Sequence, residues 1–123
     1  MKRILLPILI LVFALSSCKK DKAELITGEW QATELELAGN NLDPKDIGGI
    51  SYSFSKDGKF EYVEAGQTEE GNYAISQDGN KLNLNYEGNR SVEKEIIELS
   101  NETLVISGEE HGMSRKITLK KAH

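Results

Sequence analysis

The sequence contains few of the residues that build catalytic sites. Its 123 residues include one cysteine, Cys18, and two histidines, His111 and His123. A single cysteine excludes an internal disulfide. His111 falls in a predicted turn and His123 is the last residue, so no Ser–His–Asp or Cys–His set can be assembled on a firm element. We therefore predict no catalytic residues and do not expect an enzyme.

Metal ligands and paired carboxylates are equally hard to place. Glu109, Glu110 and His111 could donate to a metal, but adjacent side chains in a turn rarely point at one ion, so we interpret them as a solvated turn. Most other acidic residues, including Glu69 and Glu70, fall in turns, in loops or on the solvent face of strands. Sugar hydrolysis would need two carboxylates flanking a substrate. No metal and no cofactor are predicted.

Positive charge is scarce in the domain. From Glu24 onward nineteen Asp and Glu residues stand against ten Lys and Arg residues, a net charge near minus nine. Such a domain repels phosphate backbones, and it has no basic stripe with interleaved aromatics. Nucleic-acid binding is therefore excluded. Lys19, Lys20 and Lys22 give the preceding segment a small positive charge that attracts anionic headgroups weakly.

No apolar run is long enough to span a bilayer as a helix. The run from Ile4 to Leu15 has twelve residues, whereas a helix needs about 20 to cross the hydrocarbon core. It follows a short basic start, Met1-Lys2-Arg3, and precedes two small residues, Ser16 and Ser17. This order is typical of a secretory signal peptide, which we assign to residues 1–17.

The cysteine directly behind this run is similar to a lipid-attachment site. Leu15-Ser16-Ser17-Cys18 resembles the lipobox of bacterial lipoproteins. The resemblance implies cleavage before Cys18, acylation of that residue by a diacylglyceryl group and an amide-linked chain, and stable anchoring. The alternative is a secreted protein with a stray thiol, which explains less. We expect a short tether over residues 18–24, in which Lys19 to Glu24 reach about 20 Å when extended, and a folded domain over residues 25–123.

The sequence also lacks any stretch with a helical period long enough to cover a sheet, and its apolar residues alternate instead. Turn signals such as Asp-Gly recur about every ten to twelve residues, which favours a meandering all-β fold. Residues 65–70 are interpreted as a loop. Eight strands are predicted around residues 28–37, 50–54, 60–62, 73–75, 82–86, 92–99, 104–106 and 113–119.

Because each strand has one apolar face and no helices cover it, the sheet must close on itself or fold into a sandwich. Eight antiparallel strands suffice for a barrel that is filled by side chains or holds one small ligand. The apolar parity flips after Thr33-Glu34, from a bulge or from a change of buried side, and slips again at Ile96-Ile97. Residues 43–48 predict one short helical turn, with Ile47 against the open end of the sheet.

Gly28-Glu29-Trp30, at the start of the first strand, resembles the Gly-x-Trp signature of lipocalins. The resemblance implies an all-β fold, an eight-stranded antiparallel up-and-down barrel with one short helical turn after the first strand. It also implies that Gly28 lets the chain pass close under the barrel and that Trp30 plugs its closed end. A basic residue of the last strand packs across the indole in that family. Arg115 is the best match and Lys120 a weaker one.

Aromatic residues on the apolar parity are the candidate ligand-binding residues. They are Tyr52, Phe54, Tyr62, Tyr73 and Tyr86. A packed core explains them, and so does a calyx in which tyrosine hydroxyls contact a hydrophobic or amphipathic ligand. Buried tyrosine hydroxyls need hydrogen-bond partners, which favours a wet or ligand-filled mouth.

The chain as a whole resembles the small lipocalin-like lipoproteins of Bacteroidetes-type bacteria. We expect a protein anchored in the cell envelope, in the outer membrane, facing the periplasm or the cell surface. Its leading predicted function is non-catalytic binding of a small hydrophobic or amphipathic ligand in the barrel. The alternative is a solid barrel that docks another cell-envelope protein.

Overall fold

The chain enters the barrel through a short helix. The computed structural model describes the backbone of residues 18–110 and 112–122 and the side chains of residues 22–109 and 112–122. Helix α2 (Cys18–Ile26) leads into strand β1 (Gly28–Leu37). The predicted signal peptide, the side chain of Cys18, His111 and His123 lie outside the described residues.

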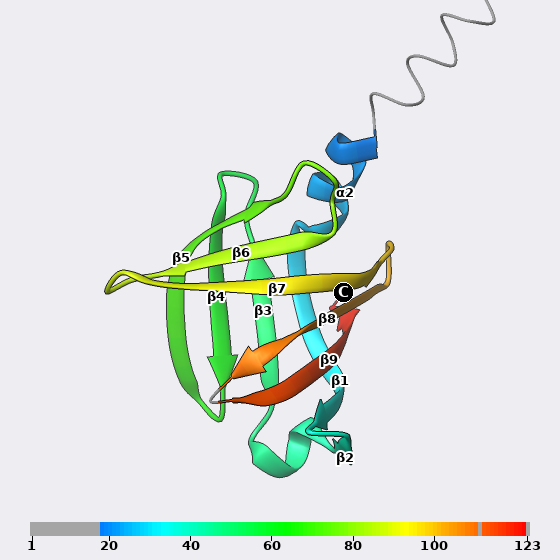
Figure 1. Ribbon diagram of the computed structural model, residues 1–123, viewed down its shortest axis with the longest axis vertical. Coiled ribbons are helices and arrows are strands. Elements are labelled where there is room, and N and C mark those ends of the chain that lie inside the picture. Colours follow the sequence, from blue (N-terminus) through cyan, green and yellow to red (C-terminus); the bar gives the residue numbers. More distant parts are fainter. Residues whose placement is uncertain (1–17, 111, 123) are drawn as a thin grey trace, which may run out of the picture.

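The described residues form one antiparallel sheet of nine strands. Strands β3 to β9 pair in sequence order. Strand β1 pairs with β3 on one side and with β9 on the other, so these eight strands close into a barrel (Figure 1). The strands after β1 are β2 (Asn40–Leu42), β3 (Ile50–Phe54), β4 (Lys59–Glu64), β5 (Gln67–Ile75), β6 (Lys81–Tyr86), β7 (Arg90–Leu99), β8 (Thr103–Glu110) and β9 (Met113–Lys121). The predicted eight-stranded barrel is confirmed. Strand β2, which was not predicted, pairs only with the end of β1.

Both predicted irregularities are register shifts between paired strands. The β1–β9 register shifts between Ala32 and Glu34, and the β7–β8 register shifts between Ile96 and Glu98. Ala32 and Leu35 are both buried on either side of the first shift, whereas Ile97 at the second is exposed. A bulge therefore explains the flipped parity in each strand.

The predicted helical turn is the 3-10 helix η1 (Pro44–Ile47). The Asp43 side chain accepts a hydrogen bond from the Lys45 N–H at 3.0 Å, and Gly48 ends the turn at φ 93°. The placement of Ile47 was wrong, because it is 36% exposed while Pro44 is buried. The face of the turn that meets the barrel is the one carrying Pro44 and Gly48, since a Cβ on Gly48 would lie 2.9 Å from Ala65 Cα.

The loop predicted for residues 65–70 was also wrong. Ala65 and Gly66, both at positive φ, form a tight turn, and β5 begins at Gln67. Residues 67–70 are exposed on both faces, so the alternation that marks a strand in sequence is missing there. They are held in the sheet by pairing with β4, where Glu69 lies opposite Tyr62.

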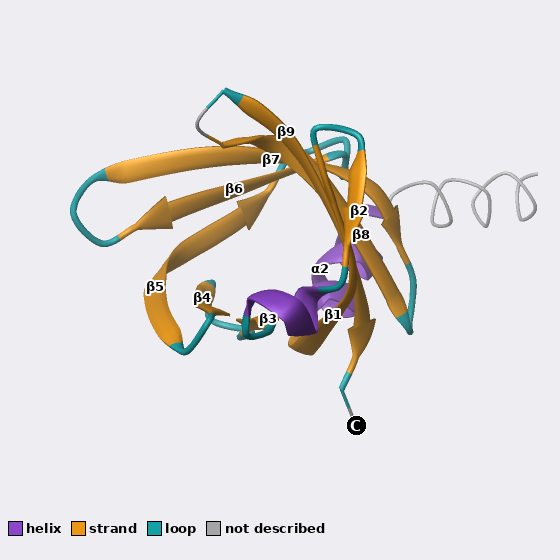
Figure 2. Ribbon diagram, turned by 90° about the horizontal axis from the view of Figure 1, so that it is seen from below, coloured by secondary structure: helices purple, strands orange, loops and turns teal. Residues whose placement is uncertain are grey.

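Strand β5 joins two groups of strands that run in different directions. In Figure 1, β3 and β4 cross behind β6 and β7, and Figure 2 shows β5 curving between the two groups. Gly71 is the middle residue of β5, opposite Phe60 on one side and Tyr86 on the other. A Cβ on Gly71 would lie 1.9 Å from the carbonyl oxygen of Asn85, so only glycine fits.

We predict that Gly71→Val strongly destabilises the barrel, by about 3 kcal/mol, because the added side chain forces β5 and β6 apart. Ala74→Val is the matched control, since Ala74 is exposed on the same strand. Urea unfolding of both variants measures the difference. Equal midpoints for the two variants would show that the curve in β5 does not depend on Gly71.

Candidate functional site

Trp30 closes the end of the barrel that carries α2, here called the closed end. Its side chain is 1% exposed, and its indole Nε1–H donates to the carbonyl oxygen of Ile26 at 2.8 Å. Ile26 itself is fully buried. The ammonium of Lys121 lies 4.5 Å from the centroid of the indole ring. The Trp30 ring thus packs between the last residues of α2 and the last strand.

The predicted pairing of Arg115 with Trp30 was wrong. The basic residue over the indole is Lys121, which lies directly opposite Trp30 in the β1–β9 register. Arg115 has the inward parity that was predicted, but it lies opposite Leu37, at the other end of β1. Because β9 runs antiparallel to β1, only the last residues of β9 reach the first residues of β1.

Lys121 also satisfies carbonyl groups at the end of α2, where the last turn of a helix lacks partners. Its ammonium donates to the carbonyl oxygens of Leu25 at 3.1 Å and Thr27 at 2.6 Å. Burial lowers the pKa of Lys121, and the charge of Glu102 partly opposes this shift. A second lysine, Lys22, donates to the carbonyl oxygen of Gly79 in the β5–β6 turn at 3.2 Å. Residues 18–24, which were predicted to form a tether, belong to helix α2. The two lysines dock this helix on the barrel.

The five aromatic residues predicted to line a ligand site all face the interior. Four are buried and Tyr73 is half-buried. Their rings touch one another: Tyr52 lies 5.6 Å from Phe54 and 4.7 Å from Tyr62, and Tyr73 lies 5.0 Å from Phe54. Tyr86 makes an edge contact with Phe60 at 5.1 Å. The rings therefore fill the space that a calyx would leave open.

The rest of the described interior is equally well packed. Ligand-sized cavities hold several hundred Å³, so the side chains that line one keep part of their surface exposed to it. Tyr73, Ile75, Val92 and Leu99 are partly buried and pack against a core whose apolar side chains are 0–8% exposed. The core side chains of the barrel are Trp30, Ala32, Leu35, Ile50, Tyr52, Phe54, Phe60, Tyr62, Leu82, Leu84, Tyr86, Ile96, Leu104, Ile106, Ile117 and Leu119. The described barrel is solid.

Among the described residues, charged side chains enter the interior at Arg115 and Glu64, towards the opposite end, here called the open end, and at Lys94 in the middle of β7. Arg115 donates to the Glu64 carboxylate at 2.6 Å, and Tyr62 also donates to that carboxylate. Lys94 is 2% exposed, beside Gly108, which lies opposite Arg115. Buried charges are tolerated when they are partnered, and none of these side chains is without a partner. We call Tyr62, Glu64, Lys94 and Arg115 the charged layer.

Sequence reasoning identified Tyr62 and Arg115 as inward residues but missed Glu64 and Lys94. The signal was present, because Lys94 has the same parity as Val92 and Ile96 in its strand, so alternation points it inward. A charged residue on an apolar parity marks either a polar interior or an error in register. Here it marks polar groups inside the barrel.

A second ion pair lies beside the barrel wall. Arg90 donates to Glu69 at 2.7 Å, and its guanidinium lies 4.1 Å from the centroid of the Tyr86 ring. Both side chains are about half exposed, so the pair contributes little to stability. Glu69, predicted to lie in a solvated loop, is therefore a paired residue of a strand.

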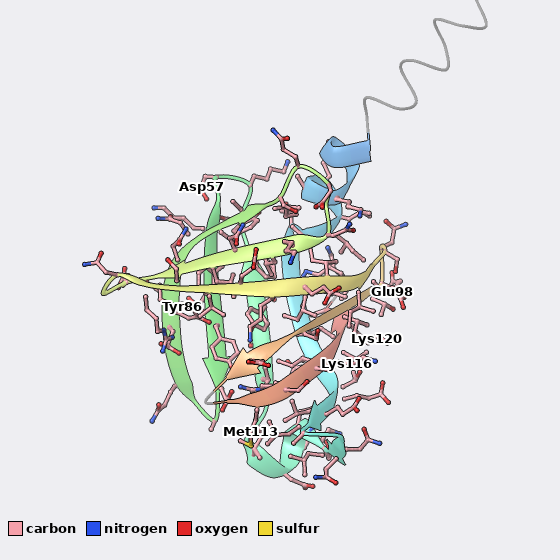
Figure 3. All side chains as sticks on the ribbon, viewed as in Figure 1. Asp57, Tyr86, Glu98, Met113, Lys116 and Lys120 are labelled. Carbon is pink, nitrogen blue, oxygen red and sulfur yellow. The ribbon has the colours of Figure 1, made fainter. Side chains whose placement is uncertain are left out.

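Exposed apolar side chains gather at the open end. Of the four large ones among the described residues, Leu42, Ile47 and Met113 lie on β2, η1 and the start of β9, and Ile97 lies on β7. Figure 1 shows β2 and η1 at the end opposite α2, and Figure 3 places Met113 at that end and Asp57 at the other. We call Leu42, Ile47 and Met113 the open-end rim.

A depression of about 1090 Å³ is lined by residues of β1 and of β3 to β7. Outward side chains such as Ser53, Glu61 and Asn85 line it, together with Phe54 and Tyr86, two of the aromatic residues predicted to bind a ligand. Within the described part of the chain, no group of three or more His, Cys, Asp or Glu residues could hold a metal ion. No described helix is both long enough and apolar enough to cross a membrane.

Comparison with known proteins agrees with this architecture. A family model described as a lipocalin-like domain matches residues 26–106. The crystal structure of a lipocalin-like protein from Bacteroides uniformis ATCC 8492 superposes with a TM-score of 0.58 at 20% identity, covering 79% of this chain and 98% of that one. A comparison with curated proteins gives no match. The family model covers more than half of the chain, which therefore belongs to the lipocalin-like family.

The two Arg–Glu pairs allow a matched test of the charged layer. Arg115→Met removes the ion pair with Glu64, whose carboxylate is partly exposed and keeps the hydrogen bond from Tyr62, and we predict a loss of about 1–2 kcal/mol in the free energy of unfolding. Arg90→Met breaks the exposed pair and should cost no more than about 1 kcal/mol. Chemical denaturation of both variants gives the comparison. A smaller loss in Arg115→Met than in Arg90→Met would contradict a buried charged layer.

Proposed function

We propose that the protein is a cell-envelope lipoprotein, anchored through Cys18, whose barrel is a non-catalytic module that docks a partner protein at its open end. Residues 1–17 would then be a signal peptide, and the folded domain would stand in the periplasm or on the cell surface. The observation that carries the docking function is the solid interior. It supports recognition by the surface of the barrel and leaves no space for an enclosed ligand.

The open-end rim supports docking at that end. Single exposed apolar residues are common on protein surfaces, but three of the four large ones described here share one end of the barrel. These residues come from β2, η1 and β9. Because their side chains are exposed, polar residues at the same positions would leave the core unchanged. A partner protein with an apolar surface patch would cover this rim.

A second candidate function is binding of a small amphipathic ligand through the open end. The charged layer favours it, because Arg115, Tyr62 and Glu64 place polar groups where a ligand's polar end would enter. The apolar part of such a ligand would have to displace the stacked rings of Tyr52 and Phe54. Ligand binding therefore requires a rearrangement of the interior, whereas docking requires none.

Native mass spectrometry of the full chain purified from the envelope of its bacterial host separates the two functions. We predict a protein complex, and no lipid-sized adduct on the free barrel. Replacing Ile47 and Met113 with Glu should reduce the recovered complex about ten-fold, because two charges would be buried in the interface. Ile97→Glu is the matched control and should leave recovery unchanged.

A lipid-sized adduct that disappears in Tyr62→Trp would instead support the ligand-binding function. Loss of the complex in Ile97→Glu but not in the rim variant would place the docking surface elsewhere on the barrel. Either result would overturn docking at the open-end rim.

A further inference from the structure

We infer that α2 is a rigid arm that holds the closed end of the barrel towards the bilayer and the open end away from it. The surface assigned to the membrane consists of α2 with the β3–β4 and β5–β6 turns. Its partner is the headgroup layer of the bilayer that anchors the chain. The inference rests on the proposed anchoring at Cys18 and adds a fixed orientation to it.

From Lys22 onward, the described contacts of α2 hold the helix against the barrel. Within the described residues only Thr27 separates α2 from β1, and its hydroxyl donates to the carbonyl oxygen of Ala23 at 3.0 Å. Lys22 fixes the middle of the helix to the β5–β6 turn, and Lys121 fixes its end. A nine-residue helix is about 13 Å long. Position 18 therefore lies about one short helix away from the closed end.

The surface around α2 fits a headgroup layer and not the hydrocarbon core. The two turns beside it present exposed polar side chains, Lys56 and Asp57 in one and Gln77 and Asp78 in the other. Hydrogen bonds from Ser55 and Ser76 lower the pKa of Asp57 and Asp78, so both carboxylates stay ionised near neutral pH. Charged turns of this kind stay in water, at the level of the headgroups. The closed end can approach the bilayer without entering it.

This orientation determines which partners can reach the open-end rim. Strand β1 has ten residues and runs from the closed end to the open end, so it spans about 33 Å along its own direction. The rim is therefore separated from the membrane surface by most of the length of the barrel and by α2. The part of a partner that covers the rim must therefore lie in the aqueous compartment, and the membrane-embedded part of a protein in the same bilayer would not reach it.

Energy transfer from a dye on the protein to an acceptor lipid tests the orientation. The full chain is produced in a bacterial envelope, purified in detergent and reconstituted into phosphatidylethanolamine–phosphatidylglycerol liposomes that contain a rhodamine lipid. Acylation of Cys18 leaves no other thiol, so Lys56→Cys at the closed end or Asn41→Cys on β2 takes a single donor dye. Because transfer falls steeply with distance, we expect several-fold more transfer from Lys56→Cys. Equal transfer, or more from Asn41→Cys, would overturn the inference.

A flexible insertion separates the role of α2 from that of the barrel surface. About ten Gly and Ser residues between Lys20 and Asp21 add a coil of roughly 17 Å and leave the contacts of Lys22 and Lys121 intact. We expect this variant to lose the difference between the two labels. If the difference persists, the barrel surface orients itself and α2 is not the cause.

Flotation of the same liposomes distinguishes failure of the orientation from failure of the anchor. A full chain that does not float with the liposomes, and behaves like Cys18→Ser, would overturn both the proposed anchoring and the orientation. A chain that floats but gives equal transfer from the two labels would overturn the orientation alone.

Discussion

The rest of the structure depends on the contact between the Trp30 indole, the Lys121 ammonium and the end of α2. The indole fills the closed end of the barrel and donates to Ile26, while Lys121 covers the ring and donates to Leu25 and Thr27. One lysine therefore joins the first strand, the last strand and the helix. This contact lies where the first and last strands of the barrel, β1 and β9, pair with each other. It also holds α2, the segment that precedes the barrel.

The closed end and the open end differ in chemistry because the interior changes along the barrel axis. Apolar and aromatic side chains fill it near Trp30, and charged groups replace them near Arg115 and Lys94. A barrel with a packed interior can recognise partners only by its surface, whereas its inner polar groups mainly fix the packing of the open end. The family fold alone leaves this distinction open, because lipocalin-like barrels of eight strands can be filled or hollow.

The sequence predicted most of the barrel because alternation, turn signals and bulges are local properties. The eight wall strands, the bulge after Ala32 and the turn capped by Asp43 all follow from neighbouring residues. Register between distant strands does not, and this is why Arg115 was paired with Trp30 in place of Lys121. Residues 67–70 were missed because both faces of that part of β5 are exposed, so the strand leaves no alternation to detect.

Hydrogen exchange of the Trp30 indole N–H tests the central claim most directly. The chain has one tryptophan, so a single indole proton reports on the closed end in an NMR spectrum. If α2 is docked, this proton exchanges only on global unfolding, as slowly as the most protected strand amides. Lys121→Met should speed its exchange. Exchange in wild type as fast as that of a solvent-exposed indole would contradict a docked helix and, with it, the proposed orientation of the barrel.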